Sequence, residues 1–323
     1  MEPTDTCLIT GATGRVGRAV IDLLTDAGVP VRALVHRAQS AATLPAGVET
    51  VSGDLTVPAS LDGALRGVRT VFLVWTAPPD TAAAVVDRLA AHARRVVLLS
   101  APHRTPHPFF QQPNPVAALF AELEGLLAAA GLDATIIRPG MLASNALLWW
   151  AGAIRDADPN RGGYANREGD GANRGDGAIR GDGVIRGDGV IRWPYGAAET
   201  APVDDRDVAA VVARALVDDG HVGGDYVLTG PEALSQAEQV EILGTALGRR
   251  LTFEELSPDE FRRGAPIGAR PAVDMLLAAW AATLGHPAHM TSTVEDILGA
   301  PPRTFRQWVT DHAAAFRPSE TTA

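Results

Sequence analysis

The chain has 323 residues, of which 46% are hydrophobic, with a formal net charge of −10 and one cysteine. The hydrophobic content suffices for a buried core, and the negative charge argues against binding of nucleic acid, whose phosphates attract a basic face. We expect neither a membrane span nor a signal peptide, because no apolar run reaches about 18 residues and the first residues lack a basic segment. A lone Cys7 excludes an internal disulfide, and we predict a cytoplasmic protein.

The first 140 residues alternate short apolar strands with helices, which predicts a parallel sheet covered on both faces. The expected strands are Thr6–Thr10, Val31–His36, Glu49–Ser52, Thr70–Val74, Val96–Ser100 and Ala134–Ile137. The expected helices are Arg15–Ala27, Ser60–Arg66, Thr81–Ala91 and Val116–Ala130. The last helix has clear end signals, with Asn114 as N-cap, Pro115 at its first position and Gly131 as C-cap.

These elements predict an α/β protein with two parts. Residues 1–140 form a Rossmann-like, doubly wound domain that binds NADP(H), and residues 141–323 form a smaller, mostly helical lobe that binds the substrate.

Three glycines, Gly11, Gly14 and Gly17, link the first strand to an amphipathic helix. Gly11 can adopt backbone angles closed to other residues, Gly14 lets the main chain approach a bound group, and Gly17 lets the helix pack on the strand. The free N–H groups and positive dipole end of the helix then favour a pyrophosphate. We therefore predict a dinucleotide site, against the alternative of a tight turn that binds nothing. The neighbouring residues expected to contact the cofactor are Thr13, Arg15 and Val16.

The end of the second strand decides between the two nicotinamide cofactors. An acidic residue there would accept hydrogen bonds from the ribose 2′-hydroxyl, whereas a basic residue binds the 2′-phosphate. The strand ends at His36 and Arg37, so we predict NADPH rather than NADH, the alternative being that Arg37 is only a solvated side chain. Asp54 is expected beside the adenine, or else as a turn-capping carboxylate. Two further residues, Trp75 and Thr76, are expected along the cofactor path.

After Pro139-Gly140 the alternation of strands and helices ends. An apolar stretch, Met141–Ile154, precedes a six-residue Gly/Asp/Arg repeat at about residues 161–192. Repeats of this kind form cation-binding turns in some proteins, but four short copies are few for a stable solenoid. We expect a solvated surface loop and assign no metal to its aspartates, Asp170, Asp176, Asp182 and Asp188.

Regular elements return after the repeat. We predict a helix from Asp204, a strand ending at Gly230, and a helix from Ser235 whose capping box includes Glu238. Residues 249–256 are expected to form one more strand, and the remainder is expected to be helical.

The chain resembles the NmrA-like, atypical branch of the short-chain dehydrogenase/reductase superfamily. Matching motifs follow in the family's order at Gly11–Gly17, Ser52–Leu55, Leu99–Ser100, Ile136–Asn145, Val203–Ala210 and Tyr226–Gly230. The resemblance implies a protein that binds NADP(H) or NAD(H). Members include quinone and enone reductases, isoflavone-type reductases and cofactor-sensing regulators without turnover.

The chain departs from the superfamily's usual chemistry. Its reductases use a Tyr-x-x-x-Lys pair, in which the lysine lowers the tyrosine pKa. All 28 basic residues here are arginine, so this mechanism is excluded, whichever of Tyr164, Tyr195 and Tyr226 is considered. Phe120 stands where relatives often carry lysine or histidine, and two acidic residues lie nearby, as in several relatives: Glu122 and Glu124.

Hydride transfer to a quinone or enone needs only a placed cofactor and modest charge stabilisation, because the resulting oxyanion is delocalised. Ser100, at the end of the fifth strand, is predicted to hold a substrate oxygen, or else to be a turn serine. His103 and His107, in the following loop, are candidate proton donors or else exposed loop residues. Residues predicted to line the substrate pocket are Asn145, Trp149 and Tyr195, with Tyr195 as a phenol donor and Trp149 as easily a core residue.

We therefore predict an NADPH-dependent reductase that acts on an apolar or aromatic small molecule such as a quinone or an enone. The alternatives are a non-catalytic NADP(H) sensor and a cofactor-dependent isomerase or cyclase. No nucleic acid or membrane is expected as a partner, and a homodimer stays open.

Overall fold

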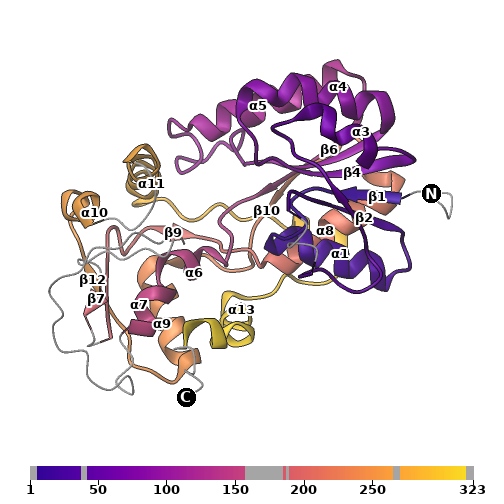
Figure 1. The fold of residues 1–323 in the computed structure, drawn as a ribbon. Helices are drawn as coiled ribbons and strands as arrows, with labels where there is room; N and C mark the ends of the chain where they lie inside the picture. The colour runs from indigo at the N-terminus through magenta and orange to yellow at the C-terminus, as the bar shows by residue number, and fades with distance from the viewer. Residues whose placement is uncertain (1–5, 38–41, 157–184, 187–188, 265–269, 318–323) are drawn as a thin grey trace, which may run out of the picture.

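The computed structural model describes residues 6–37, 42–156, 185–186, 189–264 and 270–317. At its centre is a seven-stranded parallel sheet with the strand order β10-β6-β5-β4-β1-β2-β3 (Figure 1). The strands are β1 (Thr6–Ile9), β2 (Val31–Val35), β3 (Glu49–Ser52), β4 (Val68–Val74), β5 (Arg95–Leu99), β6 (Asp133–Pro139) and β10 (Asp225–Leu228). The expected α/β, Rossmann-like sheet is thus confirmed.

The direction in which strands are added reverses at β1, which lies between β2 and β4. At such a switch point the helices that follow the two strands diverge to opposite faces of the sheet. The divergence leaves a crevice at the carboxyl ends of β1 and β4, where open α/β sheets bind their ligands.

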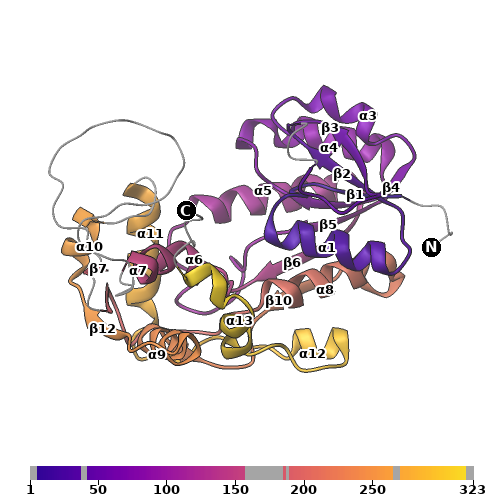
Figure 2. The same ribbon diagram turned by 60° about the horizontal axis from the view of Figure 1, so that its bottom comes forward.

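The sheet is covered on both faces because successive strand residues point to opposite sides. Cys7 and Ile9 pack with α1 (Arg15–Asp26) and α8 (Asp205–Val217). Leu8, between them, packs on the other face. The helices there are α3 (Leu61–Ala64), α4 (Ala82–His92) and α5 (Pro115–Ala129). Figure 2 shows α1 and α8 together below the sheet and α3 and α4 above it.

The predicted helix signals have structural counterparts. Asn114 caps α5 by accepting a hydrogen bond from the Val116 N–H at 2.9 Å, and Gly131 follows that helix with φ +69°. Ser235 and Glu238 form the expected capping box at the start of α9 (Gln236–Leu247).

Two predicted elements are shorter than expected. The helix expected at 60–66 is the four-residue α3, which follows a 3-10 turn at Pro58–Ser60. The strand expected at 249–256 is β12 (Thr252–Glu255), because the Arg249 N–H still donates to the Gly244 carbonyl at the end of α9.

The second half of the chain adds both to the sheet and to a separate lobe. Its β10 and α8 belong to the sheet domain, while the division at residue 140 itself stays a prediction. The lobe contains α6 (Asn145–Trp149), α7 (Ala151–Asp156), β7 (Ile185–Arg186), β8 (Val190–Trp193), β9 (Glu199–Thr200), β11 (Leu234–Ser235), α9, β12, α10 (Pro258–Gly264), α11 (Arg270–Thr283) and α13 (Phe305–Asp311).

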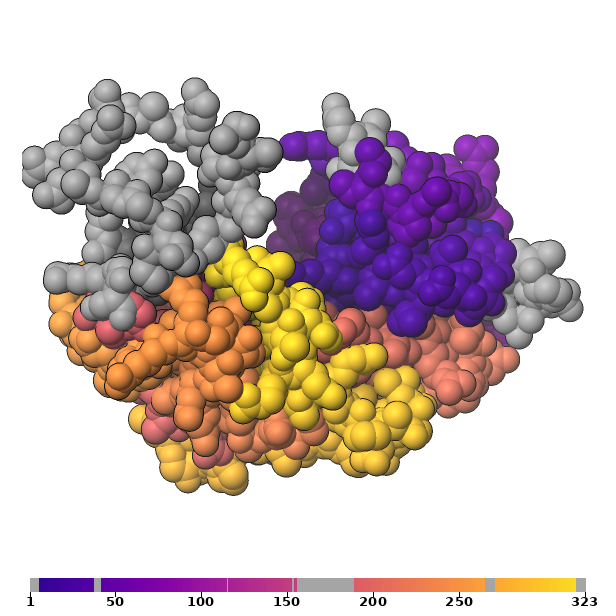
Figure 3. Space-filling view, turned by 90° about the horizontal axis from the view of Figure 1, so that it is seen from below, coloured from indigo at the N-terminus to yellow at the C-terminus, as the bar shows by residue number. Residues whose placement is uncertain are grey.

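Figure 3 shows how the end of the chain joins the two parts. The yellow residues lie against the orange lobe and also against the salmon surface beneath the sheet domain. These contacts come from α13, which packs on α9, and from α12 (Thr293–Leu298), which packs on α8. Among the described residues no helix has the length and apolar character needed to span a membrane.

Candidate active site

The three glycines form a turn that has no room for side chains. Gly11 has φ +60°, and a Cβ there would lie 2.8 Å from the Val74 Cβ. A Cβ on Gly17 would lie 2.2 Å from the Gly11 carbonyl oxygen, which would force the helix away from the strand. The Gly14 N–H donates to that same oxygen at 2.9 Å. The backbone at this turn can therefore approach a ligand closely.

The amino end of α1 is open to an anion. Gly14 is its N-cap and supplies no side-chain cap, and no acidic residue lies in the first turn. Thr13 and Arg15 are exposed beside it, while Val16 is buried under the turn. Uncapped N–H groups, a helix dipole and nearby arginine are the features that hold a pyrophosphate, so these residues fit the predicted dinucleotide.

At the other side of β1, the exposed His36 and Arg37 follow β2. The His36 Nδ1 lies 3.0 Å from an Asp54 carboxylate oxygen. Asp54 also accepts a hydrogen bond from the Thr56 N–H at 2.8 Å, and this bond, assisted by His36, holds the pKa of its carboxyl below the ordinary range. Asp54 therefore makes the turn predicted as its alternative role, and its contact with adenine stays a prediction. The exposed Thr76 and the largely buried Trp75 follow β4 at the crevice.

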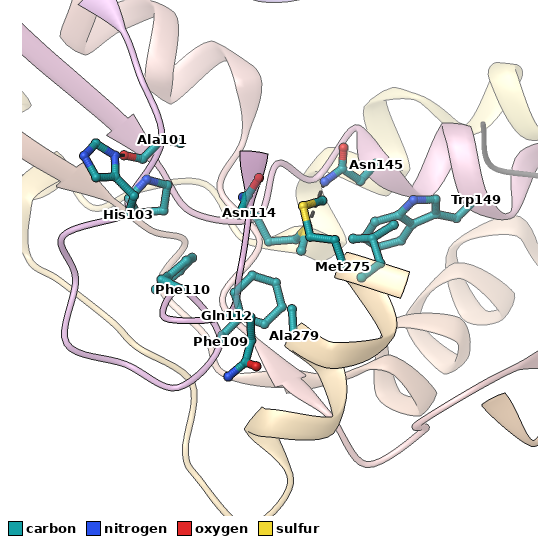
Figure 4. A pocket seen from close by; sticks show the side chains of 13 residues that line it. Ala101, His103, Phe109, Phe110, Gln112, Asn114, Asn145, Trp149, Met275 and Ala279 are labelled. Atoms are coloured by element: carbon teal, nitrogen blue, oxygen red, sulfur yellow. Dashed lines mark hydrogen bonds between the residues drawn. The ribbon is translucent and has the colours of Figure 1, made fainter. Parts of the chain in front are cut away.

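A pocket of about 290 Å³ opens beside the crevice (Figure 4). Its walls come from the loop after β5, from the segment after β6 including α6, and from α11. The lining residues are Ala101, Pro102, His103, Phe109, Phe110, Gln112, Asn114, Met141, Asn145, Trp149, Met275, Leu276 and Ala279. Among these described residues His103 has the only titratable side chain, and most of the others are apolar.

A buried ion-pair network lies behind the pocket. Arg138, only 1% exposed, donates two hydrogen bonds to the Glu124 carboxylate at 2.7 and 2.8 Å and two to Asp225 at 2.5 and 3.0 Å. Arg138 also donates to the Ala101 carbonyl at 2.9 Å, and the Ser100 hydroxyl donates to Glu124 at 2.7 Å. The network joins the ends of β5, β6 and β10 to α5 and supports the start of the pocket loop.

The network keeps both central groups charged. Burial by itself would raise the pKa of Glu124, but the hydrogen bonds from Arg138 and Ser100 hold that pKa below its ordinary value. Burial opposes the charge on Arg138 in the same way, and the bonds to Asp225 and Glu124 raise its pKa instead. The pairing is geometrically complete, which a buried pair needs in order to offset its desolvation.

His103 connects the network to the pocket. Its Nδ1 lies 3.1 Å from the Ala101 carbonyl oxygen and 3.3 Å from Arg138 Nη1. Its Nε2 is buried, has no hydrogen-bond partner and lies 3.8 Å from a Glu124 carboxylate oxygen. The Nε2 atom therefore faces the buried network, while other atoms of the His103 side chain line the pocket.

The helix α6 is fastened to the sheet domain at its start. The Ser144 hydroxyl donates to Asp205 at 2.6 Å, and Asp205 is the first residue of α8. Burial raises the pKa of Asp205, and Ser144 and Arg15 offset this only in part. The bond connects the pocket wall to the helix that packs on α1.

Comparison with known proteins decides the family. The profile of a family described as NAD(P)H-binding matches residues 11–168. A (4-alkanoyl-5-oxo-2,5-dihydrofuran-3-yl)methyl phosphate reductase from Streptomyces griseus is 37% identical over 96% of this chain and 99% of its own length. An NAD(P)H azoreductase from Xenophilus azovorans is 30% identical over 96% and 98%.

The chain belongs to the NmrA-like family of NAD(P)H-dependent oxidoreductases. The NADPH-dependent quinone oxidoreductase from Escherichia coli, solved with NADPH, covers 94% of this chain and 99% of its own, at 23% identity and a TM-score of 0.73. At that identity it shows the shared fold. The expected family and the expected oxidoreductase class are confirmed.

In this NmrA-like chain the pocket brings together three of the predicted residues, His103, Asn145 and Trp149. Ser100 lies behind them, buried and bonded to Glu124. Tyr195 is not among the described pocket residues: it lies after β8 with φ 56°, and its N–H donates to Glu255. The catalytic roles of Ser100, His103 and Tyr195 stay predictions.

Other predictions fall elsewhere. His107 lines a neighbouring hollow, where its Nε2 lies 3.0 Å from the Pro287 carbonyl. Phe120 is half-buried and packs against the core on the sheet face covered by α3, α4 and α5, and Glu122 is exposed. Tyr164 and the four repeat aspartates considered for a metal lie outside the described residues.

Sequence reasoning missed the third pocket wall and the purpose of the buried charges. Nothing local distinguishes Met275, Leu276 and Ala279 from core residues of an amphipathic helix. A usable signal existed for the ion pair, because Glu124 lies between apolar residues of a mostly apolar helix and Arg138 directly follows Ile136-Ile137. A charge in such a position is rarely buried without a partner.

Proposed function

We propose that this chain is an NADPH-dependent reductase that reduces the conjugated C=C bond of an enone-type carbonyl compound, with His103 as proton donor. The observation that carries the proposal is the largely apolar pocket in which His103 is the single titratable side chain among the described lining residues.

The position of the pocket supports a reaction with the bound cofactor. The loops after β5 and β6 form two of its walls, and β5 is adjacent to β4 at the crevice. A ring bound in this pocket lies on the same side of the sheet as a nicotinamide that extends from the pyrophosphate turn.

The relatives support an acceptor with an electron-poor double bond. The dihydrofuran named for the S. griseus reductase has a C=C bond conjugated with both its alkanoyl and its oxo group. Hydride addition to the far carbon of such a bond leaves an enolate whose charge is spread over the carbonyl oxygens. Such an enolate needs no tyrosine–lysine pair, which matches a chain without lysine.

The residues of the site have separate tasks in this reaction. When bound, NADPH supplies a hydride. The apolar walls exclude water, and His103 delivers a ring proton to the enolate, so that one hydride and one proton together saturate the C=C bond. The ring is positioned by the Ala101 carbonyl oxygen, 3.1 Å from Nδ1, and by a Glu124 carboxylate oxygen, 3.8 Å from Nε2.

The preference for NADPH follows from the end of β2. His36 and Arg37 offer two nitrogen-bearing side chains to a 2′-phosphate, and the nearby Asp54 is engaged with His36 and Thr56.

The test is oxidation of NADPH in the presence of a panel of butenolides, cyclic enones and quinones, followed at the nicotinamide absorbance. We expect turnover with the enones, and His103→Asn should lower kcat roughly 100-fold while the Kd for NADPH is unchanged. His92→Asn, at an exposed position on α4, is the matched control and should behave as wild type.

Two outcomes would contradict the proposal. Tight binding of NADPH without oxidation of any panel member would favour the cofactor sensor considered above. Full activity of the His103 variant would leave proton delivery to solvent or to another residue.

A further inference from the structure

We infer that the far end of the pocket is a subsite for a linear alkyl or acyl chain carried by the substrate, and that Ala279 and Met275 set the length of chain it accepts. This inference rests on the proposed function and names the substrate class more narrowly.

The pocket changes character along its length. Figure 4 shows His103 at one end, Phe109 and Phe110 in the middle, and Met275, Ala279 and Trp149 at the other end. The reacting group belongs at the His103 end, because His103 follows β5, the strand next to β4 at the crevice. The portion of the substrate beyond the aromatic pair then lies against aliphatic carbon and sulfur.

The helix α11 has two distinct faces. Val273, Leu277 and Trp280 recur at helical spacing and are buried in the lobe's core. The pocket residues Met275 and Ala279 are four positions apart and therefore lie one above the other on a second face. Substitutions on this face alter the pocket rather than the core.

Part of the far end is rigid. The Trp149 ring meets Trp280 edge-on, with ring centroids 5.5 Å apart and an angle of 88°. The Asn145 amide donates to the Met141 sulfur at 2.8 Å, so the polar group at this end is already engaged. These contacts fix the α6 side of the pocket against α11.

The chemistry of this end matches an alkyl chain. The unbranched side chains of Met141 and Met275 can change rotamer to pack against alkyl chains of different length. Rigid aromatic walls adapt less well to such a ligand. Each methylene buried against this methionine-containing wall should raise kcat/KM about fourfold until the chain reaches its end. Ala279, 6% exposed, supplies space because of its small side chain.

The test uses 3-alkanoyl-2(5H)-furanones with chains of two to twelve carbons, and measures kcat/KM with saturating NADPH. For the wild type we expect a rise with chain length followed by a fall. Ala279→Leu should move the optimum two or three carbons shorter, and Met275→Ala should move it longer by a similar amount. Ala278→Leu is the matched control on the same helix, because Ala278 is half-buried and is not among the described pocket residues.

The outcomes separate the two proposals. If the wild type reduces every member at a rate independent of chain length, or if Ala279→Leu leaves the optimum unchanged, the subsite is wrong and the reductase stands. If no member is reduced, the proposed function fails first. Equal reduction of the two-carbon substrate by wild type and Ala279→Leu shows that the variant is folded.

Discussion

The glycine turn after β1 and the pocket beside the crevice are built in different ways. The turn comes from seven consecutive residues, and its shape follows from glycines whose missing Cβ atoms let backbone meet backbone. The pocket comes from three separate segments, 101–114, 141–149 and 275–279, and its shape follows from side chains held by a buried ion network and by tryptophan packing. A site formed by closely packed backbone has no room for an added side chain. A site formed by side chains can accept substitutions, and these can alter which substrate it binds.

This difference explains how one family can keep its cofactor while its named substrates vary. The S. griseus and X. azovorans relatives carry different substrates in their names, although both align with almost the whole of this chain. The variable part is the wall that side chains build.

The largest expected effect comes from breaking the network behind the pocket. Arg138→Met leaves the buried Glu124 with only the exposed Arg104 as a charged partner at hydrogen-bond distance, and we expect the free energy of unfolding to fall by about 3 kcal/mol in urea denaturation. Arg94→Met is the matched control, because it removes only an exposed pair with Asp133, worth under about 1 kcal/mol.

A second variant keeps this prediction informative if Arg138→Met does not fold. In Arg138→Met/Glu124→Leu both buried charges are gone, so we expect most of the stability to return. A double variant as unstable as the single one would show that the ion pair is not what Arg138 contributes.

An effect of intermediate size, on NADPH affinity, is expected from a substitution in the glycine turn. Gly14→Asp places a carboxylate at the open amino end of α1 and a Cβ 3.2 Å from the Gly11 carbonyl oxygen. NADPH affinity, measured by fluorescence titration, should fall roughly 100-fold through charge repulsion, with little change in unfolding. Gly125→Asp is the control, because its Cβ would meet nothing within 4 Å on an exposed position of α5. Tight binding of NADPH by Gly14→Asp would show that the pyrophosphate does not bind at this helix end.

The smallest effect is expected at the 2′-phosphate. Arg37→Ser should raise the KM for NADPH about tenfold and change the KM for NADH little, because only NADPH carries that phosphate. Arg66→Ser is the control and should leave both KM values unchanged. Arg66 is exposed and lies just before β4, at the amino end of that strand and away from the carboxyl ends where the crevice lies. An equal change in the KM values for NADPH and NADH would mean that Arg37 does not bind the 2′-phosphate.

The sequence predicted most of the sheet domain because its signals are local. Strand–helix alternation, the glycine spacing and the caps at Asn114 and Ser235 each depend on residues within one element or one turn. Three residues predicted for the substrate site, His103, Asn145 and Trp149, line the pocket, and they belong to the segments that follow β5 and β6. Residues that follow adjacent parallel strands come together at one edge of the sheet whatever the rest of the chain does.

The sequence by itself determined that this protein has a parallel sheet, a turn suited to a pyrophosphate and no lysine for the usual proton transfer. Only the tertiary structure decided that Glu124, Arg138 and Asp225 share one buried network and that α11 closes the pocket. The physical reason is the distance along the chain over which each kind of signal acts. Periodicity and glycine spacing act through a few neighbouring dihedral angles, whereas Arg138 and Asp225 are 87 residues apart and meet only because β10 returns to pair with β6.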